Sequence, residues 1–269
     1  FDEVHYINDQ ARGKVWEETI MMLPHHVQLI MLSATIDTPS RFAKWVEQQN
    51  PTKEVWVCST NERVVPLKHY MYITMHDSMI DGVADKDKKS LFHNINNELH
   101  IIKTKGKEFH DQVYHRIKDV KRYMDKNRVF VKRSYALNRL IKQLQAKHML
   151  PAICFVFSRK GVEQCAADIA HSLIEEGSTH GETVEKECKQ ILIKLPNYRE
   201  YLQLPEYTFM IKLLKKGIAI HHSGVLPVLR EMVEILFSKG YIRLLFATET
   251  FAVGINMPTK TVIFTSFMK

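Results

Sequence analysis

The sequence predicts an α/β protein made of two tandem lobes, each with a parallel sheet. Short runs such as Val27–Leu32 and Ala152–Phe157 are apolar at nearly every position, which is typical of parallel strands covered on both faces. Segments with helical apolar spacing alternate with these runs. The 269 residues, 45% of them hydrophobic, suffice for two ordinary domains and exclude a disordered chain.

The first lobe is predicted over residues 1–76. Pro24 ends its first helix, and Thr38 with Pro39 supplies an N-cap and a proline at the first position of its second helix. Strands and helices alternate, as expected for a parallel sheet. The predicted elements are a helix at Lys14–Leu23, a strand at Val27–Leu32, a helix after Thr38, and strands at Val55–Val57 and His69–Ile73.

A basic, partly helical linker is predicted over residues 77–133. Asp77–Lys89 is rich in Asp, Gly and Lys and has little apolar content, which is typical of a solvated loop. Residues 91–133 are compatible with helix but carry many lysines and arginines. We interpret these charges as the solvated face of a linker, and the alternative is a dedicated nucleic-acid site.

The second lobe is predicted over residues 134–269. Ser134 is suited to cap its first helix, and Pro196 and Pro205 break a mostly helical insertion near 179–216. The predicted elements are strands at Ala152–Phe157, Gly217–Ile220, Ile242–Ala247 and Thr261–Phe264, with helices at Gly161–Ile174 and Pro227–Ser238.

Charge and cysteine content narrow the class of protein. The net charge of +8 is compatible with a polyanionic partner such as nucleic acid but does not require one. No apolar run approaches the roughly 20 residues of a membrane helix, so no membrane partner is expected. The four cysteines form no C-x-x-C pair, which favours a reducing, intracellular compartment. Because the chain opens at Phe1 without Met or a signal-like segment, we expect a piece of a longer protein.

Two adjacent carboxylates follow directly after Phe1, at the predicted carboxyl end of a strand, where open α/β sheets bind ligands. In a nucleotide hydrolase, Asp2 would hold the water shell of Mg²⁺, and Glu3 would orient or deprotonate the attacking water. His5 would link this site to a neighbouring loop. The structural alternative is an N-terminal cluster of acids.

Ser33-Ala34-Thr35 follows the strand Val27–Leu32 and therefore stands at the same kind of edge. Small hydroxylated residues in such a loop can hydrogen-bond His5 or a carboxylate and change partner as the lobes move. Taken alone, a turn with ordinary side-chain caps explains them better. Together with Asp2–His5, they favour a coupling role.

A longer set of motifs runs through both lobes in order and includes LSATI in the first lobe and FVFSRK, GIAIHHSGVLP and LFATETFAVGINMP in the second. With these motifs the sequence resembles the exosome-associated, Superkiller-type DExH-box RNA helicases of superfamily two. The resemblance implies two RecA-like lobes, the first truncated in its N-terminal half and the second at its C-terminal end. The motif segments are Phe1–Asp9, Arg12–Pro24, Leu32–Ile36, Arg41–Trp45, Arg63–Leu67, Phe155–Lys160, Gly217–Pro227, Glu234–Gly240, Leu245–Pro258 and Thr261–Thr265.

The resemblance also implies roles for individual residues. Asp2, Glu3 and His5 match the motif for Mg·ATP hydrolysis, with Asp2 holding Mg through water, and Ser33 and Thr35 match the motif that couples hydrolysis to strand movement. Short loops with hydroxyls and glycines let backbone N–H groups approach phosphates, as these roles require. The implied nucleic-acid-binding residues are Ser158, Arg159, His222, Gly224, Thr248, Glu249 and Thr250, and the implied nucleotide-binding residues are Asp2, Glu3, Gly254 and Asn256.

The sequence departs from the family pattern in three places. Ser223 stands where the family usually has Gly. No G-x-x-x-x-G-K-[ST] string occurs in the chain. The chain also ends at Lys269, before the arginine-bearing motif, and loss of an arginine finger alone costs about 10³–10⁵ in rate. We therefore expect these residues by themselves not to hydrolyse ATP.

The leading functional hypothesis is part of an ATP-dependent RNA helicase that translocates on single-stranded or 3′-tailed RNA and unwinds duplexes in RNA processing or decay. Its cofactors would be ATP and Mg, its protein partners exosome-type adaptors, and its location intracellular, cytoplasmic rather than nuclear. One alternative is a repair-type DNA helicase of the same superfamily, although Thr248–Phe251 favours the RNA enzymes. Another, for these residues alone, is a non-catalytic clamp on single-stranded nucleic acid.

Overall fold

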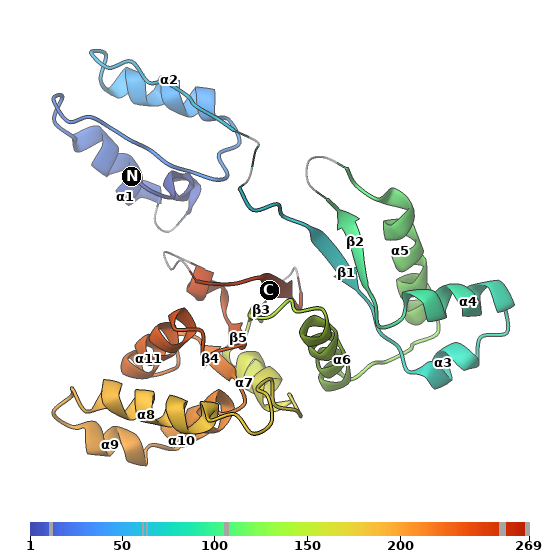
Figure 1. Cartoon of the computed structure of the whole chain (residues 1–269). Coiled ribbons are helices and arrows are strands. Elements are labelled where there is room, and N and C mark those ends of the chain that lie inside the picture. Colours follow the sequence, from blue (N-terminus) through green and yellow to red (C-terminus); the bar gives the residue numbers. More distant parts are fainter. Residues whose placement is uncertain (11–12, 61, 63, 105–107, 253–256, 267–269) are drawn as a thin grey trace. The chain divides into compact units, whose positions relative to one another are not determined.

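The structure is a computed structural model, and it describes residues 1–10, 13–60, 62, 64–104, 108–252 and 257–266. The chain divides into two compact units, Phe1–Pro66 and Leu67–Lys269 (Figure 1).

The first unit contains two of the predicted helices, α1 (Gly13–Met22) and α2 (Pro39–Gln49), and a short 3₁₀ helix, η1 (Val4–Asn8). Pro39 begins α2, as predicted from its fixed φ. Gly13 lets α1 pass close to η1, because a Cβ at this position would lie 2.2 Å from the carbonyl oxygen of Ile7. The helices bury a small apolar core around Val4, Ile20 and Val46.

The predicted strands at Val27–Leu32 and Val55–Val57 do not form as regular strands. Ile30 and Leu32 instead pair with the first residues of the chain: the amino group of Phe1 donates to Ile30 O at 2.8 Å, and Leu32 N donates to Phe1 O at 2.9 Å. A strand needs a ladder of hydrogen bonds, and the described part of this unit provides no longer partner. The apolar side chains are correspondingly exposed, by 68% at Ile30 and 83% at Trp56.

The second unit begins with a two-stranded antiparallel sheet that pairs β1 (His69–Tyr72) with β2 (Leu99–Lys103). The prediction that His69–Ile73 continues a parallel sheet is therefore wrong. The prediction of a loop at Asp77–Lys89 is also wrong, because α3 and α4 occupy most of it and Asp85 caps α4 by accepting from the backbone N–H of Asp87 and Lys88. The helices here are α3 (Asp77–Asp81), α4 (Lys86–Ile95) and α5 (Asp111–Lys126).

The rest of the second unit contains a four-stranded parallel sheet in the order β4-β5-β3-β6. This confirms the predicted α/β class and its parallel strands. The strands are β3 (Ala152–Phe155), β4 (Ile218–His221), β5 (Leu244–Ala247) and β6 (Thr261–Phe264). The helices are α6 (Arg133–Ala146), α7 (Arg159–Ala167), α8 (His180–Leu192), α9 (Tyr198–Gln203), α10 (Pro205–Leu214) and α11 (Pro227–Ser238).

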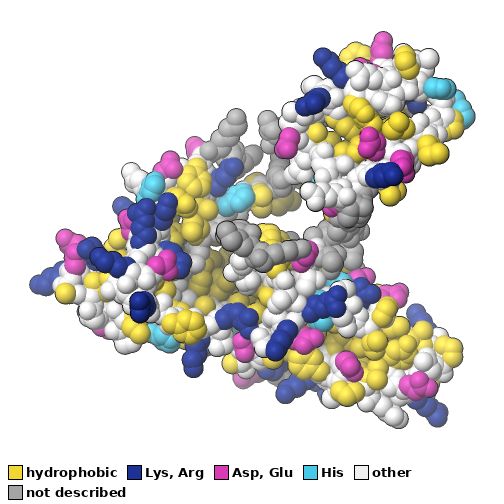
Figure 2. Space-filling model, turned by 180° about the vertical axis from the view of Figure 1, so that it is seen from behind, with side chains coloured by type: hydrophobic (Ala, Val, Ile, Leu, Met, Phe, Trp, Pro, Cys, Tyr) yellow, Lys and Arg dark blue, Asp and Glu magenta, His cyan; other side chains and the backbone are white. Residues whose placement is uncertain are grey.

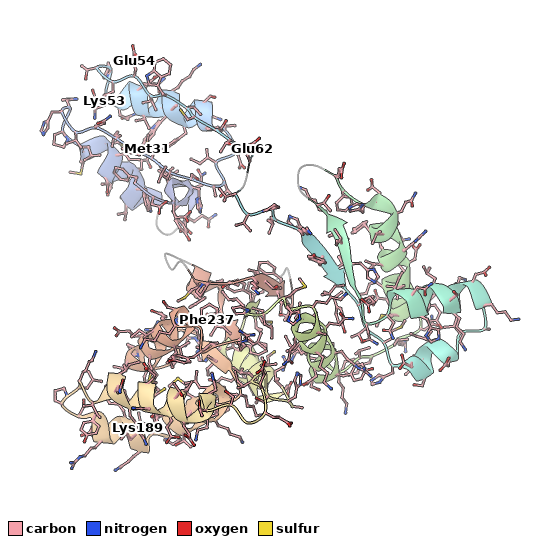
Figure 3. All side chains as sticks on the ribbon, in the orientation of Figure 1. Met31, Lys53, Glu54, Glu62, Lys189 and Phe237 are labelled. Carbon is pink, nitrogen blue, oxygen red and sulfur yellow. The ribbon has the colours of Figure 1, made fainter. Side chains whose placement is uncertain are left out.

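The strands β3, β4 and β5 are buried on both faces and are almost entirely apolar, whereas β6 exposes Val262 and Phe264. Ala152 and Cys154 pack with α6 and α7, whereas Ile153 and Phe155 pack with α8, α10 and α11, as the two-residue side-chain period of a strand requires. The helical insertion near 179–216 is therefore part of the core. Phe237 of α11 is 1% exposed within it, while Lys189 of α8 lies on the surface (Figure 3).

Candidate functional site

The two carboxylates of the first unit stand on a sharp turn before η1. Glu3 has φ 54° and ψ 40°, in the left-handed region, and its backbone N–H donates to Asp2 Oδ1 at 2.8 Å. The Asp2 carboxylate contacts the backbone of the turn, whereas the Glu3 carboxylate contacts His5, so the two neighbouring acids have different partners. Both residues are exposed to solvent.

His5 links Glu3 to the loop after Leu32. Its Nδ1 lies 3.3 Å from Glu3 Oε2 and 3.3 Å from Ser33 Oγ. Because a carboxylate only accepts, the contact with Glu3 places a proton on Nδ1. Thr35 joins this network through its backbone, whose N–H donates to Ser33 Oγ at 3.3 Å. The structure thus brings Glu3, His5, Ser33 and Thr35 together.

The acidic end of this network suits Mg²⁺ bound through water rather than by a set of direct ligands. The described residues contain no group of three or more His, Cys, Asp and Glu that could hold a metal directly. Mg²⁺, however, usually keeps several waters and needs only one or two carboxylates besides substrate phosphates. Asp2 fits this mode, because Oδ1 is held by Glu3 N while Oδ2 has no partner among the described residues.

In the second unit, Ser158 and Arg159 follow the carboxyl end of β3. Ser158 Oγ accepts from the backbone N–H of Gly161 at 3.0 Å and so caps α7. Arg159 is the first residue of α7 and is exposed. The cap fixes the direction in which this loop leaves the sheet.

The loop after β4 is built on His222, which is 2% exposed. Its Nδ1 accepts from the backbone N–H of Gly224 at 3.1 Å, so the proton of the neutral ring is on Nε2, which lies 3.2 Å from Glu163 Oε1. A Cβ at Gly224 would lie 3.1 Å from His222 Nδ1 and 3.4 Å from Arg159 Cδ, which places this loop against the loop after β3. Ser223 does not have a positive φ, so the backbone does not demand a glycine there.

The third loop follows β5. Thr248 N donates to His221 O at 3.2 Å, and the 3₁₀ helix η2 (Glu249–Ala252) begins at the next residue. The ring of Phe251 packs edge-on against His221, with centroids 4.6 Å apart. Thr248 is only 7% exposed. Gly254 and Asn256 lie outside the described residues, as does the side chain of Thr250.

The three loops stand at the carboxyl edge of neighbouring strands, because β4, β5 and β3 are adjacent in the sheet. This edge is where open α/β sheets bind ligands. The loops carry Ser158, Arg159, His222, Gly224, Thr248 and Glu249. Asp2, Glu3, His5, Ser33 and Thr35 form a separate group in the first unit.

Two glutamates that were not predicted as site residues, Glu234 and Glu163, contact the histidines at this edge of the sheet. Glu234 Oε1 lies 2.7 Å from Nε2 of His221, which is only 6% exposed in its side chain, and Glu163 faces His222. Glu234 comes from α11, 13 positions after His221, and Glu163 comes from α7, 59 positions before His222. A sequence pattern gives no signal for such pairs, because helix faces meet loops only after folding.

The paired histidines make stability depend on pH. Burial lowers the pKa of both His221 and His222 below the ordinary value, against the opposing effect of Glu234 and Glu163. Unfolded histidines, with a pKa of about 6.5, then bind protons that the folded state does not. This contribution to stability is full above about pH 6.5 and is lost as pH falls below it. We expect the free energy of unfolding to be lower at about pH 5.5 than at about pH 7.5.

Urea titrations at the two pH values measure this difference. His222→Gln should reduce it, because glutamine does not titrate, whereas His25→Gln, at an exposed position, should leave it unchanged. If the free energy of unfolding depends equally on pH in the parent chain, His222→Gln and His25→Gln, then His222 does not contribute to the pH dependence.

The chain is similar in sequence to known RNA helicases. No protein-family model matches the chain. The chain is 36% identical over 282 residues to Superkiller complex protein 2 of Mus musculus and 35% identical over 271 residues to the ATP-dependent RNA helicase mtr4 of Schizosaccharomyces pombe. It is 32% identical over 303 residues to the DExH-box ATP-dependent RNA helicase DExH11 of Arabidopsis thaliana. Each alignment covers 100% of this chain but only 21%, 24% and 22% of these relatives, respectively.

Proposed function

The chain belongs to the Superkiller-type DExH-box RNA helicases, and we propose that the protein containing it is an ATP-dependent RNA helicase that translocates on single-stranded RNA and unwinds duplexes in RNA processing or decay. The observation that carries this proposal is the whole-chain similarity to these helicases. Three loops along the carboxyl edge of one parallel sheet support it.

We assign the nucleotide chemistry to the first unit. Asp2 would hold Mg²⁺ through water, and Glu3 would orient the attacking water. The contacts from Glu3 through His5 to Ser33 give a direct route from hydrolysis to the loop that ends at Thr35. Movement of Ser33 would then change the hydrogen bonds of His5.

We assign the RNA backbone to the second unit. The loops after β3, β4 and β5 offer an exposed guanidinium at Arg159 and, at Gly224, a backbone without a side chain that a phosphate can approach closely, which suits sequence-independent contacts. Gly254 and Asn256 would add nucleotide contacts. We propose that residues 1–76 are the distal part of the first RecA-like lobe, 77–133 a linker and 134–269 the second RecA-like lobe.

The nature of the strand separates this proposal from a repair-type DNA helicase. We expect the longer protein to unwind a 3′-tailed RNA duplex and not a DNA duplex of the same sequence, with ATP present. Strand displacement followed by native gel electrophoresis measures both. Preferential unwinding of the DNA duplex would exclude the RNA assignment.

For the 269 residues alone, we propose binding to single-stranded nucleic acid without ATP hydrolysis. The chain holds no phosphate-binding G-x-x-x-x-G-K-[ST] string. Phosphate contacts release counterions, so binding should fall steeply as salt is added. ATPase activity of this chain would contradict the expected lack of hydrolysis. Failure to bind a single strand at low salt would contradict the proposed binding.

We further propose that the longer protein works with exosome-type adaptor proteins and is intracellular, cytoplasmic rather than nuclear. The four cysteines of this chain are free thiols, as in a reducing compartment, and three of them are buried. Among the described residues no helix is long and apolar enough to cross a membrane.

A further inference from the structure

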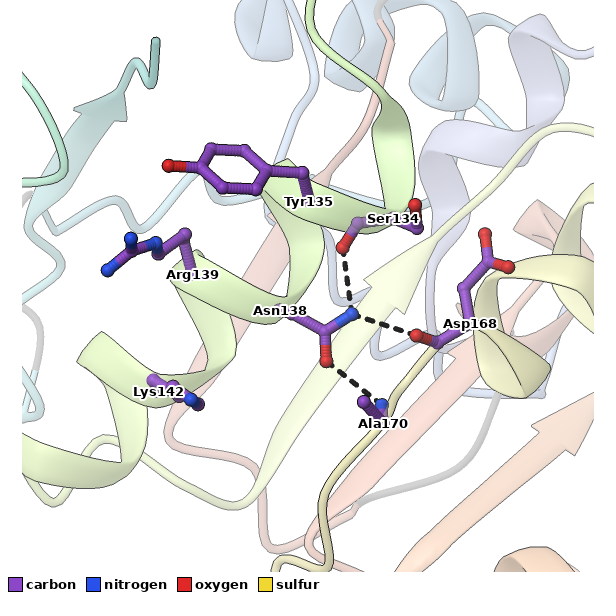
Figure 4. Close-up of a pocket in the computed structure, with 7 residues that line it drawn as sticks. All are labelled: Ser134, Tyr135, Asn138, Arg139, Lys142, Asp168 and Ala170. Atoms are coloured by element: carbon purple, nitrogen blue, oxygen red, sulfur yellow. Dashed lines mark hydrogen bonds between the residues drawn. The ribbon is translucent and has the colours of Figure 1, made fainter. Parts of the chain in front are cut away.

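The Leu67–Lys269 unit contains an open pocket whose lining residues do not belong to the three loops. Its volume is about 370 Å³, within the usual range for small-ligand sites. It lies between α6 and the segment that follows α7. Its lining residues are Ser134, Tyr135, Asn138, Arg139, Lys142, Asp168 and Ala170 (Figure 4).

The floor of this pocket is fixed by Asn138. Its Nδ2 donates to Ser134 O and to Asp168 O, both at 2.8 Å, and its Oδ1 accepts from Ala170 N at 2.9 Å. Two of these hydrogen bonds, to Asp168 and Ala170, tie α6 to the segment after α7, and the third holds the Asn138 side chain against its own helix. The pocket is therefore a built feature of the fold and not a gap between mobile surfaces.

One wall of the pocket is aromatic but closed to further stacking. The ring of Tyr135 packs against His76, with centroids 4.0 Å apart, and the guanidinium of Arg139 lies 5.3 Å from the centre of the Tyr135 ring. A nucleobase therefore has no free ring on which to stack. The contact with Tyr135 instead holds the guanidinium of Arg139 in one orientation.

The pocket has cations that lack acidic partners. Arg139 and Lys142 lie three residues apart on α6 and form no ion pair within the described part of the chain. Other cations nearby do: Lys147 pairs with Glu98 at 2.9 Å, and Arg133 faces Asp168 at 3.7 Å. The hydroxyl of Ser134 also has no hydrogen-bond partner among the described residues.

The neighbourhood of Lys142 is positive as well. The charges of Lys142 and Lys216 add to burial in lowering the pKa of His171. Lys216 donates to Ile169 O at 3.3 Å, beside Ala170. The carboxylate of Asp168 is the one acidic group that lines the pocket, and Figure 4 shows it across from Arg139 and Lys142.

We propose that this pocket binds a phosphate group, held by Arg139, Lys142 and the hydroxyl of Ser134. Two cations and a hydroxyl donor around one small cavity match the charge and the acceptor oxygens of a phosphate. The phosphate belongs either to a small free ligand or to an RNA backbone. The pocket shares no residue with the three loops, so this proposal and the helicase assignment stand or fall separately.

Isothermal titration of inorganic pyrophosphate into the 269-residue chain at low salt tests the proposal. We expect Arg139→Gln and Lys142→Gln each to weaken binding about tenfold or more, because each removes a charge-assisted contact. Asp168→Asn should strengthen it by removing the opposing carboxylate. Lys186→Gln, at an exposed cation on α8 without an ion pair among the described residues, is the matched control and should bind as the parent chain does.

Absence of pyrophosphate binding, or equal binding by the Arg139, Lys142 and Lys186 variants, would overturn the proposal. Arg139, Lys142 and Lys186 are exposed and Asp168 is partly exposed, so these variants should fold, and circular dichroism checks that they do. Competition then identifies the source of the phosphate. Displacement of pyrophosphate by a ten-residue oligouridylate assigns the pocket to the RNA backbone, and binding of pyrophosphate undisturbed by the oligonucleotide assigns it to a small ligand.

Discussion

Glu3→Gln in the longer protein that contains this chain is expected to lower ATP turnover by about 10²–10⁴-fold, the usual contribution of a general base, while ATP binding persists. The substitution removes the proton acceptor but keeps its size, and an amide oxygen can still accept from His5 Nδ1. The geometry of the turn should therefore survive. Steady-state ATPase assays give turnover, and equilibrium binding of a fluorescent ATP analogue gives affinity.

Glu17→Gln on α1 is the control, because Glu17 is exposed and makes no ion pair among the described residues. Its turnover should equal that of the parent protein. ATPase activity retained by Glu3→Gln would remove Glu3 from the proposed role. A second variant, Ser33→Ala, should keep ATPase activity and lose unwinding, because it removes the contact with His5 and leaves both carboxylates in place.

The second lobe could be predicted well because three of its four strands, β3, β4 and β5, are buried on both faces. In β3 every residue packs, alternately with α6 and α7 and with the helices of the opposite face, so the apolar run itself revealed the element. The run at Val27–Leu32 looks the same in sequence, but among the described residues it joins no sheet and pairs by a few backbone hydrogen bonds with the first residues of the chain. An apolar run shows that a segment can be a strand, and its neighbours decide whether it becomes one.

The basic residues of the predicted linker show a second limit of prediction from sequence: a count of charges does not reveal their ion pairs. Their number in the sequence does not reveal that Lys121 pairs with Asp125 at 2.6 Å and Arg122 with Asp119 at 3.1 Å, both on α5. Such pairs are typical of a solvated helix face. On the face seen in Figure 2, Lys and Arg side chains are interspersed with Asp and Glu. The interpretation of these charges as a linker surface is thereby favoured over a dedicated nucleic-acid site.

The candidate site also has a part that the sequence predicts and a part that it does not. Asp2, Glu3 and His5 are neighbours in sequence, so their motif could be recognised directly, and the contact of His5 with Ser33 accompanies the backbone hydrogen bonds of Phe1 and Val4 with Ile30 and Leu32. The pairs of His221 with Glu234 and His222 with Glu163 join residues 13 and 59 positions apart. Only the packing of helices against the sheet brings them together, so no local pattern predicts them.

Gly224→Val is expected to abolish most binding of single-stranded RNA by the 269-residue chain while leaving its fold intact. A Cβ at this position would lie 3.1 Å from His222 Nδ1 and 3.2 Å from His222 Cε1, so a branched side chain must displace either the histidine ring or the loop. Displacing the ring breaks the hydrogen bond from Gly224 N and disturbs the contact of Nε2 with Glu163. Displacing the loop moves the glycine backbone that is proposed to meet phosphate.

Fluorescence anisotropy with a labelled oligouridylate at low salt measures this loss, which we expect to be tenfold or greater, about the effect of one or two charge-assisted contacts. Gly177→Val is the matched control: a Cβ there meets no atom within 4 Å, although its φ of +79° adds local strain, and Gly177 lies far from the three loops in sequence. Urea unfolding separates lost stability from lost binding. If Gly224→Val binds RNA as tightly as the parent chain, the loop after β4 does not touch the strand. Binding must then come from the loops after β3 and β5, or from the pocket beside α6, which the Arg139 variant tests independently.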